Sequence, residues 1–459
     1  MKTIFISIFD GDTERVILRT DVFSTLKESG HRLVLLIRGK DRLAHYEKEY
    51  GSEEVLIALL PNAASKWETF WYYLSWNTLP TRAGSVRRVR EYRNAGKWFL
   101  FFLGSVAGAL GHVKIWREFL RSVYFSFGAS YADALFDTYK PDLLFAANMF
   151  SSEDTRLLRT AKRRGIKTVT IAKSWDVLTT KAFTRVKADR ILVYNECNRN
   201  EAISPGDYSA QQVTVTGFPQ FDIYTNASIY EPREVFCTRL GLDPARRIVL
   251  YGLPGDWKSP DTRAILTELD RRIASQAFVK PLQILARFHP KYQDSSEGLA
   301  GEHIVFDRPG IYFGKEGEFG IDAGVADTNR WTFGDADILH LANSIYHSDV
   351  VINVDSTLTL DAAALDKSSI LIGFDGNRKL PYRRSIAYIY EREHYRNVLV
   401  TGAAPLVRNY DELQAELNGF LFNPDYKRKE LNLLKAKLLY KIDGMAGKRM
   451  GEAVLDMLN

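Results

Sequence analysis

Runs of Val, Ile and Leu without polar alternation recur along the chain, and longer segments of mixed polarity separate them. Such continuous runs are typical of strands buried on both faces of a parallel sheet, and a parallel neighbour requires a crossover helix. In the first part of the chain the pattern predicts helices over 12–29 and 154–164 and strands over 3–9, 32–38, 141–146, 167–172 and 190–194. The alternation of the two predicts an α/β fold with a parallel sheet covered on both faces.

A second series of the same kind begins after the loop near 223–235. It predicts helices over 261–276 and 336–346 and strands over 247–252, 282–287, 303–306, 350–354 and 369–374, the last two joined by a short alanine-rich helix. The tail from Tyr410 is rich in Leu, Lys and Glu and predicts helices that pack outside the second half and back onto the first. We therefore predict two Rossmann-like domains, 1–225 and 226–459, facing a cleft that is the default binding site.

The stretch over about 62–130 interrupts this alternation with aromatic and basic residues. Four arginines lie close together, Arg87, Arg88, Arg90 and Arg93, and aromatic residues crowd both flanks. The uncharged stretch Trp98 to Val113 falls short of the ~20 apolar residues that span a bilayer. Two interpretations stay open: an interfacial segment with arginines attracted to anionic lipid, or a buried helix pair with a basic outer face. Nucleic-acid binding is disfavoured, because no recognised module follows the basic run.

Composition narrows the class of protein. The chain has 459 residues, 46% of them hydrophobic and 26% charged, with a net charge of +6 and only two cysteines. Two cysteines without metal-ligand spacing predict neither a disulfide framework nor a zinc site. The first residues lack the basic region and long apolar core of a secretion signal. We expect a folded cytoplasmic protein, peripheral at the inner face of the plasma membrane, without a bound metal.

Candidate ligand-binding residues gather in the loops that follow the predicted strands. Such loops meet at the carboxyl edge of a parallel sheet, where open α/β folds hold their ligands. The candidates are Gly217, Gly252, Lys258, Arg287, His289, Asp355, Ser356 and Thr357. Each has a structural alternative: Arg287 can pair with a carboxylate, His289 can be an imidazole with its hydrogen bonds satisfied, and Ser356 or Thr357 can cap a helix. Together they suit the charge of a nucleotide diphosphate, and the absence of GxGxxG disfavours a dinucleotide cofactor.

Three of these segments carry a family resemblance. The order Gly-x-Pro-x-x-Asp at 217–222, Arg-x-His-Pro at 287–290 and Ser-Asp-x₅-Asp-Ser-Thr-x₃-Asp-Ala-Ala at 348–363 resembles the GT-B glycosyltransferases, in the branch that includes the CDP-glycerol glycerophosphotransferases. The ending Asp443-Gly444-x₃-Lys448-Arg449 is similar as well. The resemblance implies that the second half binds a nucleotide-activated donor, with Asp361 among its contacts, that the first half receives the acceptor, and that no metal or cofactor is needed. UDP-N-acetylglucosamine 2-epimerases share the fold and part of the pattern.

The remaining candidates lie in the first half. The loop AKSWDVLTTK over 172–181 offers Trp175, Asp176 and Lys181 as acceptor contacts, because aromatic faces stack on sugars and carboxylates accept from their hydroxyls. A buried Trp beside a capping Asp would look the same. For the general base we favour Asp10, with Asp12 beside it and Asp176 and Glu153 as alternatives, whereas His289 and Arg287 would meet the charge of the leaving phosphate.

A further acidic pair, Asp335 and Asp337, directly precedes a predicted helix, so capping is its expected role rather than metal binding.

These observations predict a glycosyltransferase-type enzyme of polysaccharide biosynthesis. It would move a sugar or polyol phosphate from a nucleotide-activated donor to a cell-surface polysaccharide or lipid-linked acceptor. The alternatives are a non-hydrolysing UDP-N-acetylglucosamine 2-epimerase and a non-catalytic carbohydrate-binding scaffold. The aromatic and basic stretch favours the transferase, because a soluble epimerase has no need of a membrane-facing surface. The donor, the acceptor, the linkage and the stereochemical outcome stay open.

Overall fold

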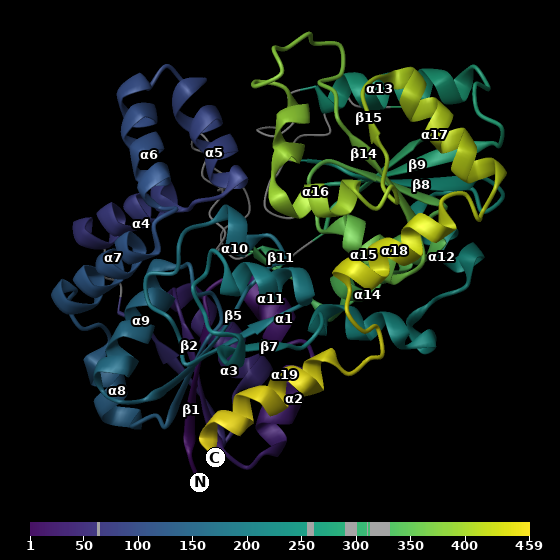
Figure 1. Cartoon of the computed structure of the whole chain (residues 1–459). Helices are drawn as coiled ribbons and strands as arrows, with labels where there is room; N and C mark the ends of the chain where they lie inside the picture. The colour runs from purple at the N-terminus through teal and green to yellow at the C-terminus, as the bar shows by residue number, and fades with distance from the viewer. Residues whose placement is uncertain (62–64, 255–260, 290–300, 310, 313–330) are drawn as a thin grey trace. The chain divides into compact units, whose positions relative to one another are not determined.

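The computed structural model of the chain describes all residues except 62–64, 255–260, 290–300, 310 and 313–330 (Figure 1). It consists of two compact units. The first unit comprises Met1–Ile223, Arg392–His394 and Tyr440–Asn459, and the second comprises Tyr224–Glu391 and Tyr395–Leu439. The C-terminal residues from Tyr440 on, which the sequence pattern grouped with the second domain, therefore cluster with the first unit.

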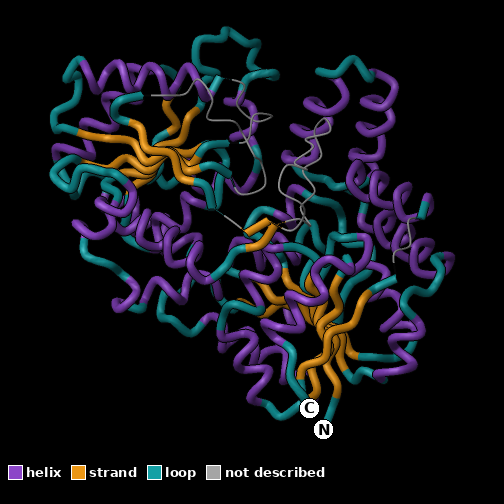
Figure 2. Tube along the Cα trace, turned by 180° about the vertical axis from the view of Figure 1, so that it is seen from behind, coloured by secondary structure: helices purple, strands orange, loops and turns teal. Residues whose placement is uncertain are grey.

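The first unit is built on a parallel sheet of seven strands in the order β3-β2-β1-β4-β5-β6-β7, drawn in orange in Figure 2. Its strands are β1 (Thr3–Ile8), β2 (Arg32–Ile37), β3 (Val55–Leu59), β4 (Leu143–Ala146), β5 (Lys167–Ile171), β6 (Arg190–Val193) and β7 (Val213–Val215). Every residue of β1 and β4 is buried, which explains their unbroken apolar sequences. Both chain termini lie in this unit, where the Lys2 ammonium donates to the Leu458 carbonyl.

The helices of the first unit are α1 (Gly11–Ile17), α2 (Asp21–Glu28), α3 (Leu43–Tyr50), α4 (Lys66–Thr78), α5 (Arg82–Arg88), α6 (Trp98–Leu110), α7 (Lys114–Phe127), α8 (Asp133–Tyr139), α9 (Ser152–Arg163), α10 (Val177–Thr180), α11 (Glu196–Ile203) and α19 (Ala446–Leu455). The single helix predicted over 12–29 was wrong. Thr20 divides it, because its hydroxyl donates to the Val16 carbonyl (2.7 Å) and accepts from the Val22 amide (3.4 Å), which ends α1 and begins α2.

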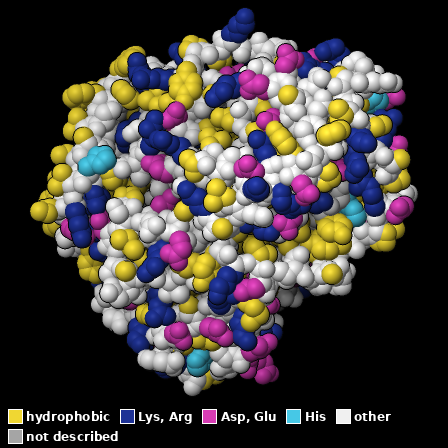
Figure 3. Space-filling model, turned by 45° about the vertical axis from the view of Figure 1, so that its right-hand side comes forward, with side chains coloured by type: hydrophobic (Ala, Val, Ile, Leu, Met, Phe, Trp, Pro, Cys, Tyr) yellow, Lys and Arg dark blue, Asp and Glu magenta, His cyan; other side chains and the backbone are white. Residues whose placement is uncertain are grey.

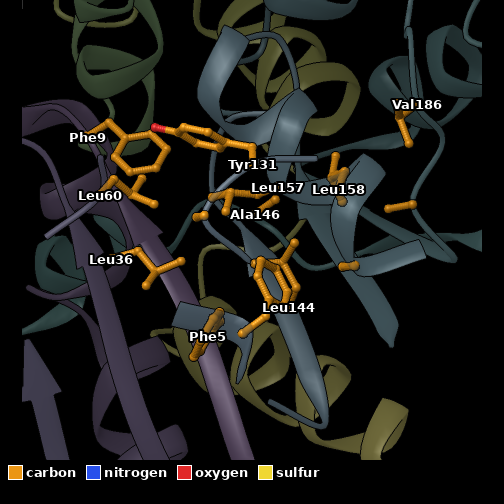
Figure 4. Close-up of a cluster of buried hydrophobic side chains, with 14 of the residues drawn as sticks. Phe5, Phe9, Leu36, Leu60, Tyr131, Leu144, Ala146, Leu157, Leu158 and Val186 are labelled. Carbon is orange, nitrogen blue, oxygen red and sulfur yellow. The ribbon is translucent and has the colours of Figure 1, made fainter. Parts of the chain in front are cut away.

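One face of the first sheet carries a large apolar core (Figure 4). Phe5 of β1 and Leu144 of β4 pack there against Leu157 and Leu158 of α9. The same cluster takes in Trp71 of α4 and residues of α7 and α8. Helices α4 and α7 of the aromatic stretch therefore pack into the core of the first unit.

The second unit has a parallel sheet of six strands in the order β10-β9-β8-β13-β14-β15, and a separate two-stranded ladder of β11 and β12. Its strands are β8 (Arg247–Gly252), β9 (Leu282–Arg287), β10 (Ile304–Asp307), β11 (Ile311–Tyr312), β12 (Trp331–Thr332), β13 (Val350–Asn353), β14 (Ser368–Ile372) and β15 (Leu406–Val407). Its helices are α12 (Arg233–Leu240), α13 (Thr262–Ala274), α14 (Asp335–His347), α15 (Leu358–Ala364), α17 (Tyr410–Phe422) and α18 (Arg428–Leu438). Helix α16 (Glu393–Leu399) begins in the first unit, and its residues from Tyr395 on belong to the second. Two parallel α/β sheets confirm the predicted fold class.

Candidate functional site

The order of strands singles out one place on each sheet. In the second unit the chain builds from β8 to one side through β9 and β10, and then to the other side through β13, β14 and β15. Ligands of open α/β sheets lie outside the carboxyl ends of the strands at such a reversal. In register, Gly252 stands between Asn353 and Arg287, so the three candidate loops of this unit begin side by side at that edge. The predicted convergence of these loops on one edge is confirmed.

The Asp355-Ser356-Thr357 loop follows β13. Asp355 adopts a left-handed backbone conformation with φ of +49°, which is uncommon outside glycine. The Ser356 hydroxyl accepts from the Leu358 amide (3.3 Å), and its carbonyl accepts from the Tyr395 hydroxyl (3.0 Å). Thr357 precedes α15 without making a capping hydrogen bond. Ser356 therefore takes the capping role, whereas Thr357 is half-buried and does not cap the helix.

Asp361 lies deeper. It is buried on α15, and its carboxylate accepts from the Tyr224 hydroxyl (2.6 Å). Nearby, Asn353 and Thr359 exchange hydrogen bonds of 3.0 and 3.2 Å. Both contacts hold the start of α15 in place. The predicted contact of Asp361 with the donor stays a prediction, because its carboxylate is buried and already binds the Tyr224 hydroxyl.

Arg287 is buried and forms an ion pair with Asp307 of β10. The His340 imidazole contacts the other Asp307 oxygen at 3.0 Å. Burial alone would raise the pKa of Asp307, but the His340 hydrogen bond and the Arg287 charge outweigh it and hold the pKa below its ordinary value. The structural alternative named for Arg287, pairing with a carboxylate, is present. His289 follows at the same edge, half-buried, and Lys258 lies outside the described residues.

A basic loop follows β14 at the carboxyl edge and was missed from sequence. Its exposed cations are Arg378, Lys379, Arg383 and Arg384. The buried Asp375 carboxylate accepts from the Ile386 amide (2.9 Å) and so closes the base of the loop. The run NRKLPYRR was a visible signal, because it puts four cations into eight residues without an acid. This loop supplies positive charge that Arg287 does not.

Gly217 has the left-handed backbone that its residue type suggested, with φ of +87°. A Cβ atom there would lie 3.1 Å from Ala446 and 3.2 Å from the Arg449 guanidinium. The Asp222 carboxylate accepts from the Ala446 and Gly447 amides (3.1 and 2.7 Å), and Arg449 donates to the Thr216 carbonyl (2.9 Å). The motifs at 217–222 and 443–449 therefore meet each other. What approaches Gly217 is the C-terminal helix, so its predicted nucleotide contact finds no support here.

In the first unit the strand order reverses between β1 and β4, and the loop after β1 holds the predicted bases. Asp10 caps α1 by accepting from the Thr13 amide (2.9 Å), and its other oxygen lies 2.6 Å from the Lys173 ammonium. Asp12 lies 3.2 Å from the same ammonium. The Asp12 side chain is 32% exposed and the Asp10 side chain 10%. Burial would lower the pKa of Lys173, but the two carboxylates raise it above its ordinary value.

Asp154 lies near this cluster, close enough for the Asp10 charge to act on it. It is completely buried and accepts from the hydroxyls of Ser7 and Ser151, the latter at 2.8 Å. Burial raises its pKa to about 8, although both hydrogen bonds oppose the shift. Its neighbour Glu153, a candidate base, is ion-paired with Arg38 at 2.6 Å. Lys173 and Asp154 were missed from sequence, because only the folded sheet brings them to Asp10.

The loop after β5 was expected to contact the acceptor sugar through an accessible Trp175 ring, but that ring is buried. The Trp175 indole is buried and packs edge-on against the His394 imidazole, with ring centroids 5.0 Å apart. Asp176, directly before α10, accepts from the Thr180 hydroxyl of that helix (3.1 Å). Lys181 is exposed at the end of that helix. The burial of Trp175 fits the structural alternative, and acceptor binding by this loop stays a prediction.

Among the residues that the structure describes, no group of three or more His, Cys, Asp or Glu side chains could hold a metal ion. Asp337 accepts from the Gly334 amide (3.0 Å) at the start of α14. The expected capping role of this acidic pair is confirmed for Asp337.

No family profile and no curated protein matches the sequence. Solved structures do match in fold. A UDP-GlcNAc 2-epimerase from Neisseria meningitidis, bound to UDP-GlcNAc, superposes with a TM-score of 0.56 at 12% identity over 99% of this chain and 100% of its own. A glycosyltransferase from Rickettsia africae gives 0.52 at 12% identity over 100% and 99%. The wall teichoic acid polymerase TagF gives 0.51 at 11% identity over 100% and 89%. The chain therefore shares the GT-B-like fold of these epimerases, glycosyltransferases and polymerase.

Proposed function

We propose that the protein is a metal-independent glycosyltransferase-type enzyme that moves a sugar or polyol phosphate from a nucleotide-activated donor to a polysaccharide or lipid-linked acceptor. The observation that carries the proposal is the cluster of Asp10, Asp12 and Lys173 at the strand-order reversal of the first sheet. Transfer to a hydroxyl needs a carboxylate that is accessible to the acceptor and fixed in orientation. This cluster offers one.

Within the cluster we assign the general base to Asp12 rather than to Asp10, which the sequence favoured. Asp10 already accepts from the Thr13 amide and the Lys173 ammonium and is largely buried, whereas Asp12 is a third exposed. Asp10 and Lys173 would act as positioning residues. Lys173 also holds two carboxylates together that would otherwise repel each other.

The donor would be held by the second unit. The hydroxyls of Ser356 and Thr357 and the imidazole of His289 lie at the strand-order reversal, where nucleotides bind in this class of sheet. The basic loop with Arg383 and Arg384 would offset the charge of the diphosphate. As the acceptor hydroxyl attacks, its proton passes to Asp12, the donor bond to the nucleotide phosphate breaks, and the phosphate leaves with the electron pair.

A 2-epimerase acting on a UDP-sugar is the competing function, favoured by the likeness to the Neisseria enzyme. One experiment separates the two. The protein is incubated with a panel of UDP-sugars and CDP-polyols, and both nucleotide release and the identity of the remaining sugar are followed. A transferase releases nucleotide faster when an acceptor is added. An epimer formed whether or not an acceptor is present would support the competing function. If neither free nucleotide nor an epimer is formed, a binding scaffold is supported.

A further inference from the structure

Helix α6 turns its large apolar side chains outward. The exposed ones are Trp98, Phe99, Leu100, Phe102, Leu103, Val106 and Leu110. The aromatic members are exposed by 59% (Trp98), 72% (Phe99) and 64% (Phe102). At roughly 200 Å² for each aromatic side chain, these three alone leave on the order of 400 Å² of apolar surface in water, as much as the largest patch of a typical soluble monomer.

The only two residues of α6 that are buried are glycines, Gly104 and Gly108. A Cβ atom at Gly104 would lie 2.4 Å from Asn77, and one at Gly108 would lie 2.7 Å from the Arg88 guanidinium. At the end of the helix, Gly111 has the Thr78 carbonyl at 1.8 Å from its Cβ position. A helix on the surface of a soluble protein packs large residues inward and leaves small or polar ones outside. Helix α6 has the reverse arrangement, because the glycines bring its backbone against α4 and α5.

Two of the four arginines beside α6, Arg87 and Arg88, are turned inward and so do not form the basic outer face that one of the two interpretations gave the helix pair. Arg87 lies over the Trp76 ring at 4.0 Å, and Arg88 is buried and donates to the Asn77 carbonyl (2.9 Å). Burial lowers the pKa of both guanidinium groups. These two arginines, at the C-terminal end of α5, stabilise the packing of α5 against α6, which lie side by side in Figure 1. Arg87 and Arg88 therefore do not supply the lipid-facing charge that was expected of all four arginines.

Helix α6 itself carries no charge, and an exposed lysine stands at each of its ends. The segment 98–113 holds no charged residue, and the exposed lysines Lys97 and Lys114 bracket it. Arg93 lies 5.6 Å from the Trp98 ring at the same end. Trp beside Lys at the end of an apolar stretch is the arrangement found at the level of lipid headgroups. Figure 3 shows hydrophobic side chains gathered near the upper left edge of the face it presents, with Lys and Arg among them.

Length and anchoring decide how this surface meets a membrane. Helix α6 has 13 residues and is about 20 Å long, too short for the ~30 Å hydrocarbon core. Among the described residues no single helix is long and apolar enough to span a bilayer. Helices α6 and α7 taken together are, but the chain bends by 107° between them. Helix α7 is held in the fold, because Arg117 and Arg121 lie 2.6 and 2.8 Å from the Asp207 carboxylate. The pair cannot straighten into a span without breaking these buried contacts.

We propose that α6 lies in the plane of a lipid bilayer, with its apolar face at the boundary between headgroups and acyl chains and with Lys97 and Lys114 at the lipid phosphates. The occupant of this face is lipid rather than a second copy of the chain, because an uncharged helix bracketed by lysines complements an anionic headgroup layer, whereas two such helices facing each other would oppose like charges. The proposal does not depend on the reaction catalysed.

The test is co-sedimentation of the full chain with neutral phosphatidylcholine vesicles and with vesicles that also contain phosphatidylglycerol. The variant is Phe99→Ser with Phe102→Ser, and the matched control is Phe422→Ser, which removes an equally exposed Phe (78%) from α17 of the second unit. We expect the double variant to lose at least about 100-fold in partitioning onto both kinds of vesicle, because each inserted aromatic is worth roughly 10-fold or more. The control should bind as the wild type does.

A second variant, Lys97→Gln with Lys114→Gln, should lose about 25-fold on anionic vesicles and little on neutral ones. Because the altered side chains are exposed, circular dichroism and melting temperature should stay unchanged. Unaltered vesicle binding of the double Phe variant would overturn the proposal. So would a wild-type dimer, seen by analytical ultracentrifugation without lipid, that the Phe variant converts to monomer, since a second copy would then cover this face.

Discussion

Replacing Lys173 by Met tests the charged cluster of the first unit. The ammonium lies 2.6 Å from Asp10 and 3.2 Å from Asp12, and its side chain is 16% exposed. Removing one partner of a largely buried ion pair costs about 3–5 kcal/mol, because the remaining charge stays desolvated. The lower end applies here, since Asp12 is partly solvated and Asp10 keeps the Thr13 amide. We therefore expect a loss of about 3 kcal/mol, or roughly 6–12 °C in the melting temperature of this unit.

The assay is differential scanning calorimetry, with hydrogen exchange of β1 and β5 to assign the transition to the first unit. The matched control is Lys167→Met, which removes an exposed lysine from the start of β5, the strand that precedes Lys173; because its one contact, to the Asn459 carbonyl, is also exposed, the loss should be less than about 0.5 kcal/mol. In the double variant with Asp10→Asn, the loss should be smaller than the sum of the two single losses. Equal melting temperatures for Lys173→Met and the control, or strictly additive losses, would refute the ion-pair account.

Three further predictions follow from buried groups and from the donor site. Because the folded Asp154 carboxyl has a pKa of about 8 and stays protonated where the unfolded one ionises, the first unit should lose up to about 1.4 kcal/mol of stability per pH unit between pH 4 and 8; Asp154→Asn should remove this slope in urea titrations. Glu68→Gln, which strips Arg159 and Arg185 of a buried partner, should cost about 3 kcal/mol or more in the same titrations. Donor-dependent nucleotide release should survive excess EDTA, and its loss would point to a bound metal.

Most of the fold could be predicted from sequence where strands are buried on both faces. The strands β8 and β9 fall on the predicted residues because an unbroken apolar run leaves little choice of boundary. The failures have local causes. The hydroxyl of Thr20 competes for the helix backbone and divides 12–29, and β3 (Val55–Leu59) escaped notice in front of the aromatic stretch.

For the candidate site, too, some features could be predicted from sequence and others could not. Loops at strand ends could be found from periodicity, since the carboxyl edge of a parallel sheet gathers them. Partners distant in the chain could not be found. Lys173 is 163 residues from Asp10, and Ala446 is 224 residues from Asp222. Nor does sequence say which way an arginine points: Arg88 lies inward because the glycines of α6 leave it room.

The central claim is that Asp12 removes the acceptor proton while the second unit holds the donor. The most direct test is to compare Asp12→Asn with the wild type, using the donor from which the wild type releases nucleotide, and to measure both the turnover of acceptor into product and the donor Kd by calorimetry. We predict that kcat falls by at least about 100-fold, because a general base is worth that much, while the donor Kd changes less than twofold. Unchanged turnover, or an epimerised donor as the sole product, would contradict the account.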